Sequence, residues 1–149
     1  LRGYAQPRVS WLGQLPDSHD YVDTAIRPQA ITPPGLLIAR PAEPMFFGNA
    51  APLLGLIVQR VNAASPDAPI HTVILSLEVT PNLDGTTIDA LREFAELLDH
   101  RNIRLVLART RSAVQQVLTR AAIAQLPPDS CSAFSVDDAV RSVSTGTRA

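Results

Sequence analysis

Residues 73–98 read VILSLEVTPNLDGTTIDALREFAELL and decide the fold class. The first five of them are apolar except for Ser76, which is typical of a strand that is buried on both faces of a sheet. After a break at Pro81, apolar residues recur at helical spacing through about Asp99. A buried strand that leads through a short loop into an amphipathic helix is the repeating unit of α/β proteins.

The same alternation of strand and helix continues on both sides of this stretch. Short apolar or extended runs predict strands at residues 21–26, 36–39 and 103–107, with short extended pieces at 45–47 and 132–134. Apolar periodicity or a capping-box pattern predicts helices at about 49–64, from 112 onward and at 135–143. The sequence therefore predicts a mixed, mostly parallel β-sheet of four to five strands flanked by four to five helices.

The chain of 149 residues has the usual size of one domain. Residues 1–20 hold two prolines and two glycines, so we interpret them as an irregular linker. Residues 21–144 are the predicted domain, and residues 145–149 are expected to form a flexible tail. The sequence begins at Leu1 instead of a methionine, which suggests a piece of a longer protein.

The composition excludes several classes of function. The net charge is −1, so no strong field attracts nucleic acid, and we expect no nucleic-acid partner. All 13 basic residues are arginine, which excludes a Schiff-base lysine and a phosphate-binding Walker lysine. Cys131 is the single cysteine and is expected to be a buried, inert thiol. No apolar run approaches the ~20 residues of a membrane-spanning helix.

No group of residues in the sequence points to catalysis. His19, His71 and His100 share no metal-ligand spacing, and no cysteine pair supports them. The phosphate-binding patterns GxxxxGK[ST] and GxGxxG and the nucleophile pattern GxSxG are all absent. Because no nucleophile, base and orienting group occur together, we expect a protein that is not an enzyme and has no metal site or resident cofactor.

One loop stands out because it joins the buried strand of residues 73–77 to the helix that follows. Ligands of open α/β sheets bind at the carboxyl ends of such strands, and a helix N-terminus favours anions. The predicted regulatory or anion-binding residues are Asn82, Asp84, Gly85, Thr86 and Thr87. A phosphate on Thr86 would add negative charge close to Asp84. The alternative is plain helix capping, for which aspartate and threonine are well suited.

Residues 73–91 resemble the signature of STAS domains, the fold shared by SulP anion transporters and anti-sigma-factor antagonists. In that family an apolar strand leads into an Asp-x-Ser/Thr-Gly loop and then a helix. Asp84 matches the acidic position, and Thr86 matches the hydroxyl that antagonists use as a phosphorylation site. Thr87 stands where the family usually has glycine, and Ser76 stands where many members have aspartate. These departures bear on a phosphorylation switch more than on the fold.

Further blocks resemble the transporter branch of the family, and the resemblance covers about residues 12–143. Leu12–Pro16, followed by Tyr21–Asp23, is similar to the segment after the last transmembrane helix of SulP proteins. The block PGLLIAR at residues 34–40, followed by MFFGNA at residues 45–50, resembles their second-strand region. Soluble antagonists generally lack this block, so it favours the transporter branch.

The resemblance implies a cytoplasmic regulatory or interaction domain of a SulP-type transporter for sulfate or a related anion. Its residues 1–20 would follow the last transmembrane helix, at the cytoplasmic face of the inner (plasma) membrane. The implied partners are the transmembrane domain of the same transporter and a cytoplasmic regulatory protein, and weak GTP or ATP binding at the loop Asp84–Thr87 is compatible with it. The alternative is a free-standing STAS protein, similar to anti-sigma-factor antagonists and switched by phosphorylation at Thr86.

Overall fold

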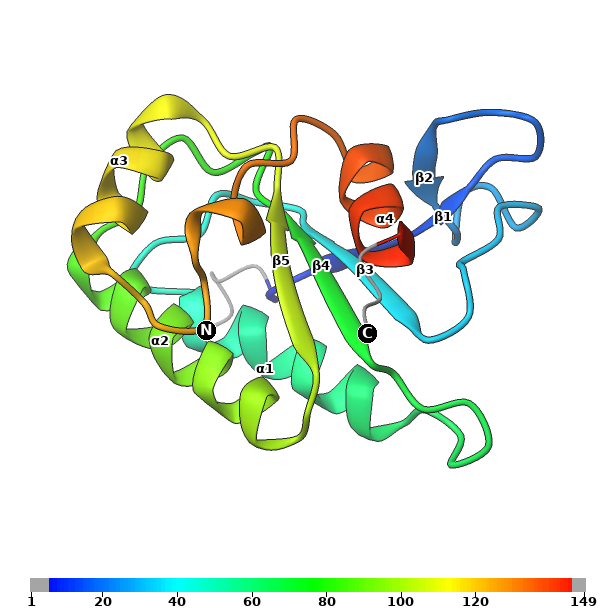
Figure 1. Cartoon of the computed structure of the whole chain (residues 1–149), viewed down its shortest axis with the longest axis horizontal. Coiled ribbons are helices and arrows are strands. Elements are labelled where there is room, and N and C mark those ends of the chain that lie inside the picture. The colour runs from blue at the N-terminus through cyan, green and yellow to red at the C-terminus, as the bar shows by residue number, and fades with distance from the viewer. Residues whose placement is uncertain (1–5, 146–149) are drawn as a thin grey trace.

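The computed structural model describes residues 6–145, and its strands form one five-stranded sheet (Figure 1). The strands are β1 (Val9–Gln14), β2 (Tyr21–Asp23), β3 (Leu36–Pro41), β4 (Thr72–Ser76) and β5 (Arg104–Ala108). They lie in the order β2-β1-β3-β4-β5, with β3, β4 and β5 parallel and β1 antiparallel to both β2 and β3. The predicted mixed α/β sheet is confirmed.

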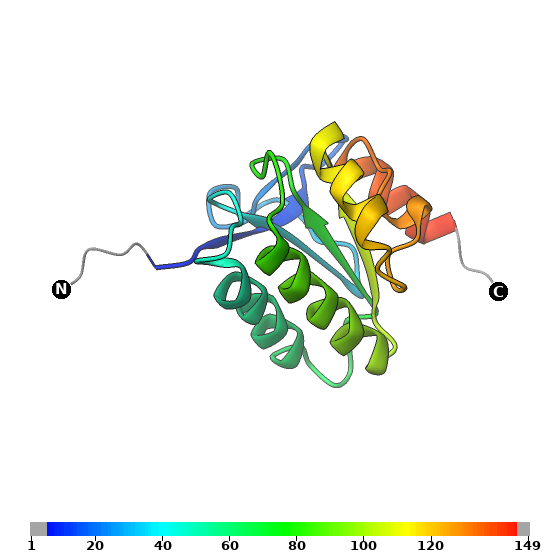
Figure 2. The same ribbon diagram turned by 90° about the vertical axis from the view of Figure 1, so that its left-hand side faces the viewer.

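Helices cover both faces of this sheet. The described residues form α1 (Ala50–Asn62), α2 (Gly85–His100), α3 (Ser112–Ala121), α4 (Val136–Thr145) and the short 3-10 helix η1 (Pro128–Ser130). Helices α1 and α2 pack side by side on one face, and α4 packs against β4 and β5 on the other (Figures 1 and 2). The result is a three-layer arrangement that buries most residues of the parallel strands.

Strand β4 is central to both layers of the core. Successive side chains of a strand point to opposite faces, so Val73 and Leu75 pack in the cluster formed with α1 and α2. Ile74 packs in the second cluster, which contains Val136 and Val140 of α4. Burial on both faces explains why this strand is apolar apart from the buried Thr72 and Ser76, as predicted for residues 73–77.

The interpretation of residues 1–20 as irregular is wrong for Val9–Gln14, which is strand β1. Its backbone pairs with β3 through Val9 and Pro41 at one end, and with β2 through Gln14 and Tyr21 at the other. A strand held by partners distant in the sequence leaves a weak local signal, because strand preference depends on packing more than on the residues themselves.

Several shorter predictions also differ from the structure. The strand predicted at residues 21–26 ends at Asp23. Its carbonyl accepts turn hydrogen bonds from the N–H groups of Ile26 and Arg27. Residues 45–47 are not a strand, since 45 and 46 are irregular and 47 begins a turn, and residues 132–134 contribute only an isolated bridge between Ala133 and Ala108. Ser112 lies inside α3 and does not cap it, whereas the predicted cap at Ser135 is confirmed by its bond from Asp138 N–H.

Gly35 provides a test of how β3 begins. Its φ is +79°, and a Cβ at this position would overlap the His71 ring. We expect Gly35→Ala to lower the free energy of unfolding by about 1 kcal/mol, because an L-residue in this conformation is strained. Urea denaturation measures the change.

Gly55, in the middle of α1, is the matched control for this substitution. A Cβ there meets no atom within 4 Å, so Gly55→Ala should leave the protein equally stable or make it more stable. A loss at Gly55 with no loss at Gly35 would contradict this account of β3.

Candidate functional site

The predicted loop lies between β4 and α2, and Asp84 is its central residue. Asp84 caps α2, since its Oδ1 accepts a hydrogen bond from Thr87 N–H at an N···O distance of 2.7 Å. Its other oxygen, Oδ2, accepts from Phe47 N–H at 2.9 Å. The carboxylate therefore joins α2 to a loop that lies 37 residues earlier in the chain.

These hydrogen bonds keep Asp84 charged. The pKa of Asp84 lies below its ordinary value, mainly because the carboxylate accepts the Thr87 N–H, while slight desolvation opposes this. The Thr87 hydroxyl and Phe47 N–H lower the pKa further by smaller amounts. The Thr87 hydroxyl is fully buried, and among residues 6–145 it makes no hydrogen bond of ordinary geometry.

The five predicted site residues separate into two groups. Asp84 and Thr87 are brought together as the cap of α2. Asn82, Gly85 and Thr86 are exposed, and the Asn82 side chain accepts a hydrogen bond from the neighbouring Leu83 N–H. The predicted capping by Asp84 is therefore confirmed, and the Thr86 hydroxyl lies on an exposed residue of the loop.

The structure brings a second loop, residues 44–49, against the first. Met45 N–H donates to the buried Thr80 hydroxyl at 3.1 Å, next to the bond between Phe47 and Asp84. Asn49 stabilises the turn itself, because its Oδ1 accepts from Phe46 N–H at 2.9 Å. The sequence patterns indicate both loops but not their contact, because an N-cap aspartate carries no local signal for the donor that its second oxygen accepts from.

Two aromatic side chains of this second loop remain exposed. Phe46 is 46% exposed and Phe47 is 70% exposed, and their rings meet edge to face with centroids 5.2 Å apart. Burying such large side chains is favourable. Apolar surface next to a capped helix N-terminus is thus available for contact with a partner.

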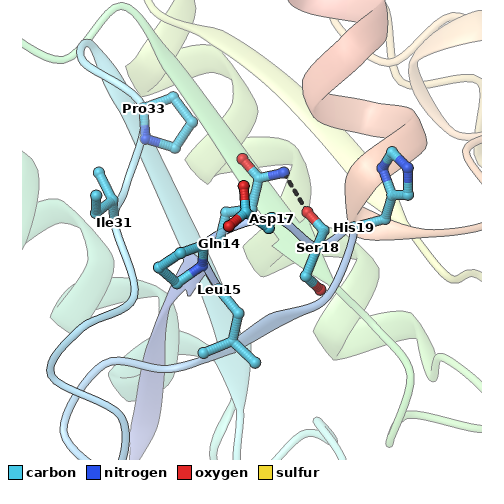
Figure 3. Close-up of a pocket in the computed structure, with 8 residues that line it drawn as sticks. Gln14, Leu15, Asp17, Ser18, His19, Ile31 and Pro33 are labelled. Atoms are coloured by element: carbon cyan, nitrogen blue, oxygen red, sulfur yellow. Dashed lines mark hydrogen bonds between the residues drawn. The ribbon is translucent and has the colours of Figure 1, made fainter.

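A separate open cavity of about 560 Å³ lies between the β1–β2 turn and the start of β3 (Figure 3). Its lining includes Gln14, Ser18, His19 and Ile31. Figure 3 shows Gln14 turned toward the turn, where its side-chain amide donates to the Ser18 carbonyl at 2.6 Å. The cavity is at the far end of β1 from the Val9–Pro41 pair, so it is not part of the Asp84 loop.

Three further features bear on metal binding, membrane insertion and thiol chemistry. Within residues 6–145, no three His, Cys, Asp or Glu side chains gather as a metal site would require. No helix in that range combines the length and the apolar character that a bilayer crossing demands. Cys131 is buried as predicted, and burial, aided by the charge of Asp129, raises the pKa of its thiol to about 11.

Comparison with known proteins gives consistent similarities. Sulfate transporter 3.1 of Arabidopsis thaliana is 28% identical over 122 residues, which is 78% of this chain and 18% of that relative. The chain spans about a fifth of the length of the curated relatives that it matches.

Solved structures share the fold at lower identity. The murine Slc26a9 anion transporter matches 94% of this chain and 22% of its own, with a TM-score of 0.80 and 19% identity. The STAS domain of a SulP transporter from Vibrio cholerae matches 80% of this chain and 91% of its own, with a TM-score of 0.60 and 21% identity. The family model of the STAS domain matches residues 27–137, and the chain therefore belongs to the STAS domain family.

Proposed function

We propose that this chain is the regulatory and interaction domain of a SulP-type transporter for sulfate or a related anion, on the cytoplasmic face of the membrane. The observation that supports this most is that the chain matches sulfate transporters over only about a fifth of their length. Under this proposal the domain binds partners and performs no chemistry of its own. Its first partner is the transmembrane domain of the same protein, and its second is a cytoplasmic regulatory protein.

The path of β1 supports such an arrangement. Val9 pairs with Pro41 at the carboxyl end of β3, and Arg8 forms an ion pair with Glu43 at 3.2 Å. The chain thus enters the sheet at the same end as the loops around Phe47 and Asp84. Under the proposal, a preceding transmembrane domain lies close to these loops. A conformational change in the transmembrane domain is then transmitted to the loops, and the reverse.

An antibody against the domain tests this proposal directly. Immunoblots of fractionated cells should show a membrane-bound protein much larger than the 16.0 kDa of this chain. A band near 16.0 kDa outside the membrane fraction would contradict the transporter proposal and favour a free-standing STAS protein.

The exposed hydroxyl of Thr86 favours a second candidate function, a switch operated by phosphorylation. A phosphate there would be attracted by the N-terminus of α2 but repelled by the charged Asp84 two residues away. Treatment with a kinase active on STAS antagonists, followed by mass spectrometry, tests the idea, with Thr86→Ala as control. An unmodified Thr86 would argue against the switch.

Weak nucleotide binding at the same loop is the third element of the proposal. The free N–H groups at the start of α2 favour phosphates, but the Asp84 carboxylate repels them and the chain has no lysine to compensate. We therefore expect Asp84→Asn to strengthen GTP or ATP binding by about two- to fivefold, the usual size of an exposed charge interaction.

Amide chemical shifts during a nucleotide titration measure this effect. The shifts should concentrate in residues 82–90, and Glu96→Gln, on the exposed face of α2 outside this range, is the matched control. Shifts scattered elsewhere, or equal strengthening by both substitutions, would contradict a nucleotide site at this loop.

A further inference from the structure

Three arginines gather at the carboxyl end of the parallel strands around one glutamate. Glu78 Oε1 lies 3.5 Å from Arg109 Nε and 3.9 Å from Arg40 Nη1. Arg111 Nη2 donates to the Glu78 carbonyl at 2.9 Å. We name Arg40, Glu78, Arg109 and Arg111 the arginine edge; Arg40 lies near the end of β3, and the others lie in the segments that follow β4 and β5.

The arginine edge carries more positive charge than its own ion pairs neutralise. Two guanidinium groups, those of Arg40 and Arg109, share the Glu78 carboxylate, and their side chains are 28% and 48% exposed. The third, that of Arg111, bonds only the backbone carbonyl of Glu78 and is exposed. Ion pairs with this much solvent contact are weak. Each guanidinium has five N–H donors, so most donors of the edge stay available for an acidic ligand.

The backbone conformation of Arg109 is energetically unfavourable. Its φ is 58°, in the left-handed region that residues other than glycine and asparagine rarely adopt. The conformation is held by Arg109 N–H, which donates to the Ala133 carbonyl at 2.9 Å. Such strain concentrates at functional positions, and here it occurs at a residue of the arginine edge.

Exposed aromatic side chains occur in two segments that are hydrogen-bonded close to the arginine edge. Phe46 and Phe47 belong to a loop that is bonded to Thr80 and Asp84, in the segment that follows Glu78. Phe134 is 88% exposed and follows Ala133, the residue bonded to Arg109. Arginine between aromatic residues is the composition enriched at protein–protein interfaces.

We propose that the arginine edge and its bordering phenylalanines dock an acidic segment of a partner protein, with apolar side chains on either side of its carboxylates. Carboxylates match the planar fork of arginine. A small free anion fits less well, because the guanidinium groups are too exposed to enclose it. A membrane surface fits less well, because the Glu78 carboxylate lies against both Arg40 and Arg109 and would oppose a continuous anionic surface. The inference does not depend on the transporter proposal.

An NMR titration tests this docking surface on the ¹⁵N-labelled chain. The probe is a short synthetic peptide in which Glu alternates with Phe and Leu, and the reference peptide has Gln in place of Glu. We expect shifts at residues 44–47, 78, 109–111 and 133–134, which weaken as salt is added. The Gln peptide should bind at least about fivefold more weakly, because it lacks the charges.

Matched substitutions separate charge at this surface from charge elsewhere. Arg111→Glu should weaken binding of the Glu peptide by about fivefold or more. Arg104→Glu makes the same change at an exposed residue at the opposite end of β5 and should have little effect. For the apolar part, Phe47→Ser should weaken binding, whereas Ile31→Ser, at a residue 67% exposed, should not.

Each other outcome of the titration overturns the proposal. Equal effects of Arg111→Glu and Arg104→Glu would mean a general charge effect. Inorganic sulfate or phosphate that gives the same shifts at similar concentration would mean a small-anion site. Binding to phosphatidylserine vesicles without binding to the Glu peptide would mean a lipid surface. Absence of peptide binding by a chain whose spectrum shows it folded would mean that the arginines serve only their contacts with Glu78.

Discussion

Leu75→Ala should lower the free energy of unfolding by about 3 kcal/mol, the usual cost of removing a fully buried leucine side chain. Leu75 is completely buried in the middle of β4, where it packs among side chains of α1 and α2. The surrounding sheet is fixed by pairing on both sides of the strand. Because neighbouring strands cannot move in to fill the space, a cavity should remain.

Urea denaturation of the wild type and the variant measures this loss. Leu97→Ala in α2 removes the same atoms from a side chain that is only partly buried against the same core. It should cost clearly less, about 1 kcal/mol, because less apolar surface is lost from the core. Equal costs for the two substitutions would contradict the central position of β4.

Asp84→Ala should lower the free energy of unfolding at neutral pH by about 1 to 2 kcal/mol, because the helix loses its cap and two N–H groups lose their acceptor. The two donors are Thr87 N–H and Phe47 N–H. The loop with Phe46 should also become less ordered, which faster amide exchange at Phe47 would report. Asp89→Ala, on the exposed face of α2, is the control and should change stability little.

The contribution of Asp84 should also depend on pH. The pKa of Asp84 is lowered in the folded protein, so the folded state holds this proton less tightly than the unfolded chain. The stabilisation is therefore fully present above the unfolded pKa of about 4 and is lost as pH falls through the folded pKa. The stability difference between wild type and Asp84→Asn should be constant near neutral pH and shrink in acid. A difference that grows on acidification would contradict the assignment.

Local patterns in the sequence predict those elements that can be identified from residues close together in the chain. The buried run of β4 and the apolar stripe of α2 are of this kind, and so is the cap at Asp84. Strand β1 was missed because its partners, β2 and β3, come later and define its two sides.

The same distinction applies to the candidate site. The bond from Phe47 to Asp84 and the gathering of three arginines around Glu78 depend on the order of strands in the sheet. No spacing in the sequence encodes these contacts, since Arg40 and Arg109 meet only when β3 and β5 lie on either side of β4. The family resemblance pointed to both loops without indicating that they meet.

The shortness of β2 has a consequence for how copies of this chain meet one another. An outer strand normally presents a row of unpaired N–H and C=O groups, a template on which another chain can add a strand. Here β2 spans only Tyr21–Asp23 and is followed at once by a turn. At the other border of the sheet, β5 begins with the exposed charge of Arg104. The edges of the sheet therefore offer few unpaired backbone groups to another copy. This disfavours repeated strand addition, which is the first step toward fibrous aggregates.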